Sequence, residues 1–387
     1  MSNILKYLET PQINHEKIYE VMRDFRKAGL NPEMYGEFIN TINKLPKIRL
    51  RGPHVYHVFN KFNLTNITSE DLMVVMKEVM QRSIEDSKFC WHVEASRASC
   101  NLDSAGKIIV SAAHSIQNNG VLSTISKNHE VITYKFQPGG LKGKVIKKKV
   151  ASIFWGFCNT HDTIFNTIEN FPYRKTEEQN FLFAYRSFVV ASHKKMEIST
   201  FMNFGGQAEN DIIENRRIFD NAIAKKDYSI IKTDVFELSL FYPIACSSSF
   251  YLDFDFEGVV IPHSDGRMEN VFITLLPVIK ENKTYFLLSY FKEDAHLYEK
   301  VGIQMRKRNK LKSDISIIIA AHAENVYFEP SYYTTFIEQF EEDLYTLLFQ
   351  TQMDHGVVNQ YDEINHSFSY TPETYLQNQY DINIFGY

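Results

Sequence analysis

The most restrictive feature of this sequence is a cysteine–histidine pair inside the aromatic stretch FWGFCNTHDTIF, residues 154–165. Cys158 and His161 are three positions apart, a spacing that brings both side chains to one face of a helix. The chain has only 4 cysteines, and three of them fall between residues 88 and 172 together with several histidines. The pair either holds a metal ion or belongs to a hydrophobic core, and the other cysteines bear on that choice.

Two ligand pairs can be assembled from this segment. Structural zinc takes four nitrogen or sulfur ligands in a tetrahedron, commonly supplied as two close pairs. Cys158 and His161 form one pair, and Cys90 and Cys100 form a looser one, in which His92 could replace either cysteine. We therefore predict one structural Zn²⁺ held by Cys90, Cys100, Cys158 and His161. The alternative is a buried apolar cysteine beside a histidine that bonds a backbone carbonyl.

Composition limits the class of protein. Hydrophobic residues make up 44% of the chain, which is enough for a sizeable core, and the formal net charge is −5. Nucleic acid would therefore have to contact a local basic patch. Four cysteines are too few for a disulfide scaffold, and we find no signal peptide or apolar run long enough to cross a bilayer. We predict a cytoplasmic protein without membrane contact.

Four regions differ in their residue patterns. Residues 1–87 predict a helical N-terminal region, 88–172 a small metal-binding module, 173–353 a C-terminal α+β region, and 354–387 a polar, Tyr-rich tail that is a surface extension or an interaction segment. The predicted fold class is α+β, with a zinc-stabilised ββα-like module and antiparallel strands in the C-terminal region. No Pro/Gly/Ser-rich linker separates the regions, so we expect one packed body.

Two elements of the C-terminal region carry clear signals. Thr176 and Gln179 form a capping box before a long apolar-periodic stretch, which predicts a helix start. Residues 270–291, NVFITLLPVIKENKTYFLLSYF, predict a β-hairpin around the polar turn KENK.

The ligand-rich segment resembles a treble clef and, more widely, the HNH-type or ββα-metal nucleases. In that family a strand with a catalytic histidine lies between the two ligand pairs, and an asparagine follows in the loop. The matching stretch is SAAHSIQNNG, residues 111–120, with His114 on the strand and Asn118 and Asn119 in the loop. The resemblance covers residues 88–172 and implies a metal-dependent nuclease acting on DNA or RNA. By analogy, it also suggests a defence effector.

The resemblance also implies roles for single residues. His114 would be the general base and Asn118 would accompany it, while Asp162 (or Asn166, one turn on) would hold a catalytic Mg²⁺ or Mn²⁺. The sequence departs from the family at position 113, an alanine where a metal-binding His or Asp is usual.

A second departure concerns His161. The family's last helical histidine maps to this residue, which the zinc prediction already uses. If His161 held the catalytic ion instead, the zinc site would need His92 or His129.

A basic stretch, GGLKGKVIKKK, lies between the ligand pairs at residues 139–149. Its lysines could make sequence-independent contacts to phosphates of a nucleic acid, and the alternative is a solvated hairpin tip. The predicted nucleic-acid-binding residues are Lys142, Lys144, Lys147, Lys148 and Lys149.

Two functions remain open from the sequence. The first is the HNH-like nuclease, and the second is a non-catalytic, zinc-stabilised interaction or scaffold protein with a protein partner or a second copy bound through its helical regions. A buried His114 without an acidic neighbour would favour the scaffold.

Overall fold

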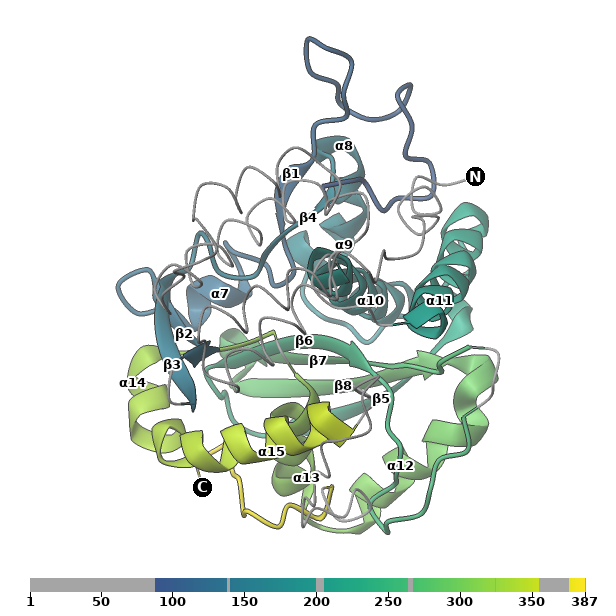
Figure 1. Ribbon diagram of the computed structural model, residues 1–387. Helices are drawn as coiled ribbons and strands as arrows, with labels where there is room; N and C mark the ends of the chain where they lie inside the picture. The colour runs from purple at the N-terminus through teal and green to yellow at the C-terminus, as the bar shows by residue number, and fades with distance from the viewer. Residues whose placement is uncertain are drawn as a thin grey trace, which may run out of the picture.

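The structure is a computed structural model that describes residues 88–137, 140–199, 205–263, 267–323, 325–354 and 376–386 (Figure 1). The predicted helices of residues 1–87 lie outside the described residues. The described chain is mixed α+β with two antiparallel sheets, as the sequence predicts for its fold class.

The larger sheet has seven strands in the order β3-β2-β9-β6-β7-β8-β5, and every neighbouring pair is antiparallel. Its strands are β2 (Glu130–Gln137), β3 (Gly140–Lys147), β5 (Ile231–Leu238), β6 (Ile244–Phe250), β7 (Val271–Val278), β8 (Lys283–Phe291) and β9 (Val326–Phe328).

Helices cover both faces of this sheet (Figure 1). On one face lie α12 (Ala295–Lys307), α13 (Leu311–His322) and α15 (Glu341–Asp354), and on the other α10 (Glu177–Ser199) and α11 (Gly205–Lys225). Side chains of a strand alternate between the two faces of the sheet. Ile273 therefore packs in the core under α12, α13 and α15, while its neighbour Phe272 packs in the core under α10 and α11. Burial on both faces is why strand β7, VFITLLPV, is apolar almost throughout.

The hairpin and the helix start that the sequence predicts in the C-terminal region are both present. Residues 270–291 form the β7–β8 hairpin. Helix α10 begins at Glu177, and the Gln179 backbone N–H donates to Thr176 Oγ1 at 3.2 Å. The Gln179 side chain does not return to Thr176, as a full capping box requires, but accepts from the Arg174 backbone N–H at 2.6 Å.

The second sheet is a two-stranded ribbon of β1 (Ser111–His114) and β4 (Ile153–Phe157). The chain continues from β4 into the short helices α8 (Asn159–Asp162) and α9 (Asn166–Asn170). The hairpin β2–β3 is inserted between β1 and β4 in sequence and pairs with β9 of the larger sheet. Strand pairing therefore crosses the domain boundary predicted at residue 172.

Most of the predicted tail lies outside the described residues, but its end does not. Leu376, Ile382, Ile384 and Phe385 are buried in the core beneath α13 and α15. The prediction of a surface extension is wrong for residues 376–386, because this stretch is too short to show a hydrophobic period. None of the helices in the described ranges is long and apolar enough to cross a bilayer.

Candidate functional site

The four predicted metal ligands lie together. Their ligand atoms are all within 4.8 Å of one another, and each side chain is almost inaccessible to solvent. His161 Nδ1 lies 3.4 Å from the sulfur of Cys90, 3.4 Å from that of Cys100 and 3.3 Å from that of Cys158. Around a tetrahedral zinc ion a sulfur and a nitrogen ligand are roughly 3.5 Å apart. The arrangement therefore fits a metal ion such as zinc.

Local bonds bring the two ligand pairs together. Asn101, next to Cys100, accepts through Oδ1 from the backbone N–H of Thr160 at 3.2 Å and from its hydroxyl at 3.0 Å. Thr160 itself lies between Cys158 and His161. On the other side, the Trp91 backbone N–H donates to the Gly156 carbonyl at 2.8 Å. The residues next to the ligands thus hold the two segments in register.

The thiols differ in acidity. Burial raises the pKa of Cys90 to about 12 and also raises the pKa of Cys100. Burial acts in the same direction on Cys158, but hydrogen bonds from the backbone of His161 and Asn101 outweigh it and lower the pKa of that thiol. Burial lowers the pKa of His161, so its ring is neutral near pH 7. A metal ion would displace the thiol protons and bind a ready acceptor nitrogen.

The two histidines that could have replaced a ligand lie outside the set of four. His92 stacks on His161 with ring centroids 4.3 Å apart and forms a second group with His161 and Glu94. His129 is exposed in the turn before β2 and belongs to neither group.

The predicted catalytic histidine ends β1. His114 is half-buried, and its Nδ1 lies 2.9 Å from the carbonyl oxygen of Ala151, just before β4. A carbonyl only accepts, so Nδ1 carries the proton and Nε2 has the free lone pair. Burial lowers the pKa of His114, while the Ala151 bond and the charge of Glu169 oppose the shift. Ala113 is buried, and its methyl group has no atom that could bind an ion.

Sequence reasoning missed two charged residues beside His114. Glu169 on α9 pairs with Arg186 of α10 at 2.5 Å, and Arg186 lies over the Phe165 ring. The sequence held a signal for Glu169, because it follows Asp162 by seven positions, the spacing of one face in a continuous helix. Arg186 comes from a distant helix, and its role could not be inferred from spacing.

The structure does not give Asp162 a direct bond to His114. Burial raises the pKa of Asp162, which the nearby charge of Arg186 partly offsets. Within the described ranges, neither Asp162 nor His114 belongs to a group of three side chains close enough to hold an ion.

The loop after β1 contains the two predicted asparagines. Asn118 Nδ2 lies 3.5 Å from Asn119 Oδ1, and Asn118 also accepts from Ser123 Oγ through its backbone carbonyl at 2.8 Å. Asn118 thus braces the loop against the short helix α7 (Val121–Thr124). It does not bond His114.

The five predicted lysines do not form one patch. Lys142 and Lys144 lie on β3, an edge strand of the large sheet, and Lys142 pairs with Glu341 at 3.1 Å. Lys147 pairs with Glu130 at 2.6 Å, while Lys148 contacts Ser123 and lies within electrostatic range of His114. Lys149 is exposed in the following turn.

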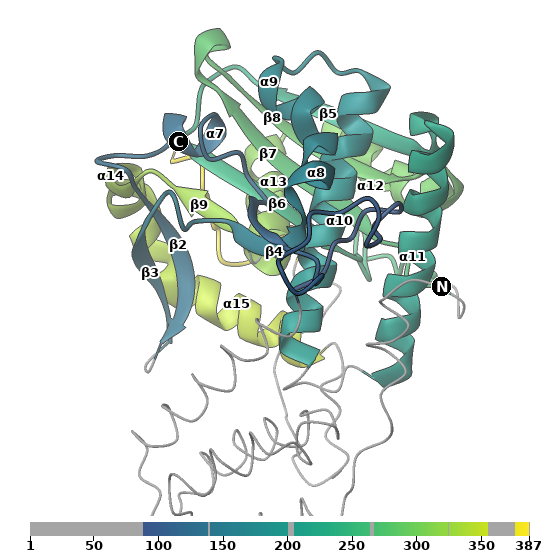
Figure 2. The ribbon, with the colours of Figure 1, turned by 90° about the horizontal axis from the view of Figure 1, so that it is seen from above.

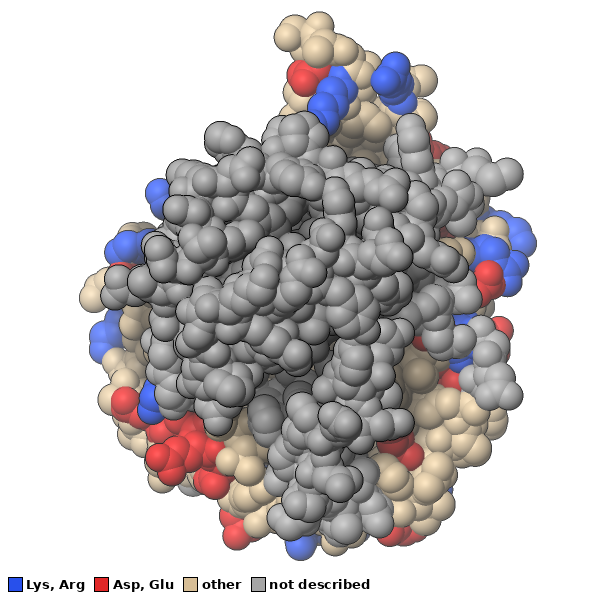
Figure 3. Space-filling model, viewed as in Figure 1, with Lys and Arg blue, Asp and Glu red and all other residues tan. Residues whose placement is uncertain are grey.

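Figure 3 shows basic side chains along the edge formed by β2 and β3, with an acidic group directly below. That group includes the acidic first turn of α15, which contacts β3. The acidic turn repels a polyanion, so the part of the edge around Lys142 is less favourable for nucleic acid. The Lys148 half is next to His114.

Strand β4 and helix α8, which carries His161, lie beside α10 on one face of the sheet (Figure 2). Fold and site together define a mixed α+β protein with a Cys₃His cluster that could hold a metal ion such as zinc. Comparison with protein-family models, curated proteins and solved structures finds no match.

Proposed function

We propose that this protein is a metal-dependent nuclease in which Zn²⁺ at the Cys₃His cluster supports the fold and His114 acts as general base. The observation that carries the proposal is the bond between His114 Nδ1 and the Ala151 carbonyl at 2.9 Å. This bond fixes the tautomer that leaves Nε2 able to accept a proton. Burial also lowers the pKa of His114, which keeps the ring in its neutral, proton-accepting form near pH 7.

The chemistry is hydrolysis of a phosphodiester. A water molecule gives one proton to His114 Nε2, its oxygen bonds to phosphorus, and the ester bond to the leaving oxygen breaks. The leaving oxygen takes a proton from solvent. Lys148 and Lys149, in the turn beside His114, would contact the phosphates of the bound strand.

The proposal also draws on the order of elements and on the resemblance to ββα-metal nucleases. His114 ends β1, β4 is its antiparallel partner, and the chain then enters α8 and α9 with the second ligand pair at their start. Asn118 stands in the loop after the His114 strand, where the family has its asparagine.

A catalytic Mg²⁺ or Mn²⁺ would take its protein ligand from Asp162. Mg²⁺ at phosphate-transferring sites commonly uses one or two carboxylates and completes its shell with water and substrate oxygens. The ion would supply positive charge to the developing leaving oxygen. Glu169 is less suited to hold it, because its carboxylate already pairs with Arg186 at 2.5 Å.

The second candidate is the non-catalytic scaffold. The observation in its favour is that the ligand cluster belongs to the same core as α10 and α11. A metal ion there would join the β1–β4 ribbon to the helical layer without any chemistry. Glu169, an acid near His114, argues against this alternative.

The deciding experiment compares two histidine variants in a cleavage assay on single- and double-stranded DNA and RNA with Mg²⁺ or Mn²⁺. His114→Ala should lower cleavage by about a hundredfold or more, with zinc content and fold retained. His129→Asn is the matched control, because it changes an exposed histidine of the same segment and suits the positive φ of 61° there. Cleavage that survives His114→Ala would leave the scaffold as the better account.

A further inference from the structure

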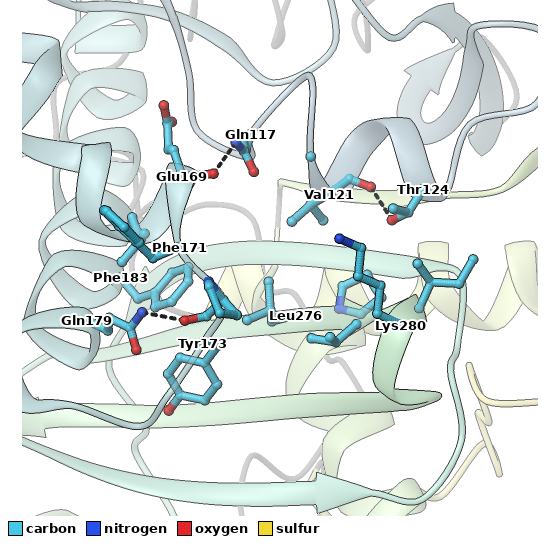
Figure 4. A pocket seen from close by; sticks show the side chains of 16 residues that line it. Gln117, Val121, Thr124, Glu169, Phe171, Tyr173, Gln179, Phe183, Leu276 and Lys280 are labelled. Carbon is cyan, nitrogen blue, oxygen red and sulfur yellow. Dashed lines mark hydrogen bonds between the residues drawn. The ribbon is translucent and has the colours of Figure 1, made fainter.

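A cavity of about 180 Å³ opens next to the His114 region, between the loop after β1 and the segment after α9 (Figure 4). Gln117, three residues beyond His114, lines one side. Glu169, whose charge acts on the His114 ring, lines it as well. The cavity therefore begins within three residues of the proposed catalytic histidine along the chain.

Aromatic rings form much of the cavity wall. Phe171, Tyr173 and Phe183 line the side opposite Val121 and Thr124 (Figure 4). Phe171 is 65% exposed, the largest exposed fraction among the large hydrophobic side chains that the structure describes. Its ring therefore adds little to the core and offers an open face on which a flat group could stack.

Most polar groups around the cavity are already bonded within the protein. The Gln179 amide donates to the Pro172 carbonyl at 2.8 Å, and the Tyr173 hydroxyl donates to Asn180 at 2.8 Å. Gln117 differs, because Nε2 donates to the Glu169 carbonyl at 2.6 Å while Oε1 has no hydrogen-bond partner among the described residues.

Gly120 makes this arrangement possible. A Cβ atom at Gly120 would lie only 1.8 Å from Gln117 Oε1, so any other residue would displace the amide. The chain thus keeps one acceptor oxygen at the cavity. Such an oxygen suits the exocyclic amino group of a nucleobase.

The charges around the cavity favour a polyanion. Lys280 lines it on the β7 side, and Lys148 contacts Ser123 of α7, the helix that lines the cavity through Val121 and Thr124. The acid of the cavity, Glu169, is neutralised by Arg186. A nucleic-acid strand could therefore cross the His114 site without being repelled by Glu169, because Arg186 balances the charge of that carboxylate.

We propose that this cavity binds one unpaired nucleobase of the substrate, next to the phosphodiester presented to His114, so that the substrate is single-stranded DNA or RNA. The inference rests on the proposed function. A volume of about 180 Å³ is smaller than the usual pocket for a drug-sized ligand and suits one ring system. A paired base would first have to be flipped out of its duplex, at a cost of a few kcal/mol.

Binding is measured with the full-length His114→Ala protein, so that cleavage does not interfere. The probes are a fluorescein-labelled single-stranded oligonucleotide and the same strand annealed to its complement. Phe171→Ala should weaken single-strand binding by about 5- to 150-fold, the effect of removing one stacking side chain, and Phe171→Trp should restore it. Ile303→Ala on α12, an exposed apolar side chain on the other face of the sheet, should have no effect.

Two results would overturn the inference: single-strand affinity unchanged by Phe171→Ala, or an equal loss for the duplex. If wild-type protein cleaves nucleic acid in either case, the proposed function stands and only the base pocket fails. If the wild-type protein neither binds nor cleaves any of the probes, the proposed function itself fails.

Discussion

His114 Nδ1 and the Ala151 carbonyl oxygen lie 2.9 Å apart, which ties the end of β1 to the turn that carries Lys148 and Lys149. The bond sets the proton position on the imidazole and connects the ring to this basic turn. The ion pair of Glu169 and Arg186 at 2.5 Å also acts electrostatically on this ring. The histidine therefore has charges of both signs in its surroundings.

Replacing Lys148 and Lys149 by alanine should weaken nucleic-acid binding. It should also make the slope of log affinity against log salt concentration shallower, by about the amount that two phosphate contacts contribute. The matched control is Lys142→Ala with Lys144→Ala, which removes the same charge beside the acidic first turn of α15. Binding titrations at several salt concentrations measure both. Equal effects of the two double variants would show that the lysines act as one diffuse patch.

Asn101→Ala should lower the free energy of unfolding of the metal-loaded protein by about 1–2 kcal/mol, because Thr160 loses an acceptor for two hydrogen bonds. It should also weaken zinc binding, since Asn101 holds the two ligand pairs together. Urea unfolding and competition with a zinc chelator measure the two effects. Asn159→Ala, at an exposed position beside Thr160, is the control and should leave both values unchanged.

The buried carboxyl of Asp314 should make stability depend on pH. Burial raises its pKa from 3.8 to about 6, with Arg308 acting in the opposite direction. Because the folded pKa lies above the unfolded one, the native state binds this proton more tightly. The free energy of unfolding should therefore fall as pH rises from about 4 to about 6, by up to about 3 kcal/mol.

Asp314→Asn should remove that part of the pH dependence. Urea unfolding of both proteins between pH 4 and pH 7 gives the two profiles, and their difference isolates Asp314 from other titrating groups. Profiles that run parallel would contradict the assignment.

Local sequence signals anticipated much of the fold. The β7–β8 hairpin and the start of α10 follow from alternation, turn residues and an N-cap, all of which act within a few positions. The juxtaposition of Cys90 and Cys100 with Cys158 and His161 followed from the rarity of cysteine and the ligand demands of zinc.

Features that depend on distant contacts could not be anticipated. The pairing of Glu169 with Arg186 joins two helices, and the division of the lysines arises because α15 brings Glu341 to β3. Burial of Ile384 and Phe385 depends on the space left beneath α13 and α15. None of these partners is marked by spacing along the chain.

The central claim is that the Cys₃His cluster binds one zinc ion, because both proposed functions need it. The most direct measurement is elemental analysis combined with X-ray absorption on protein purified without chelator. We expect one zinc per chain with three sulfur ligands and one nitrogen ligand, lost in Cys158→Ser and retained in Cys246→Ser, whose sulfur is buried in another core. Protein that is folded, active or inactive, and free of zinc would contradict the account.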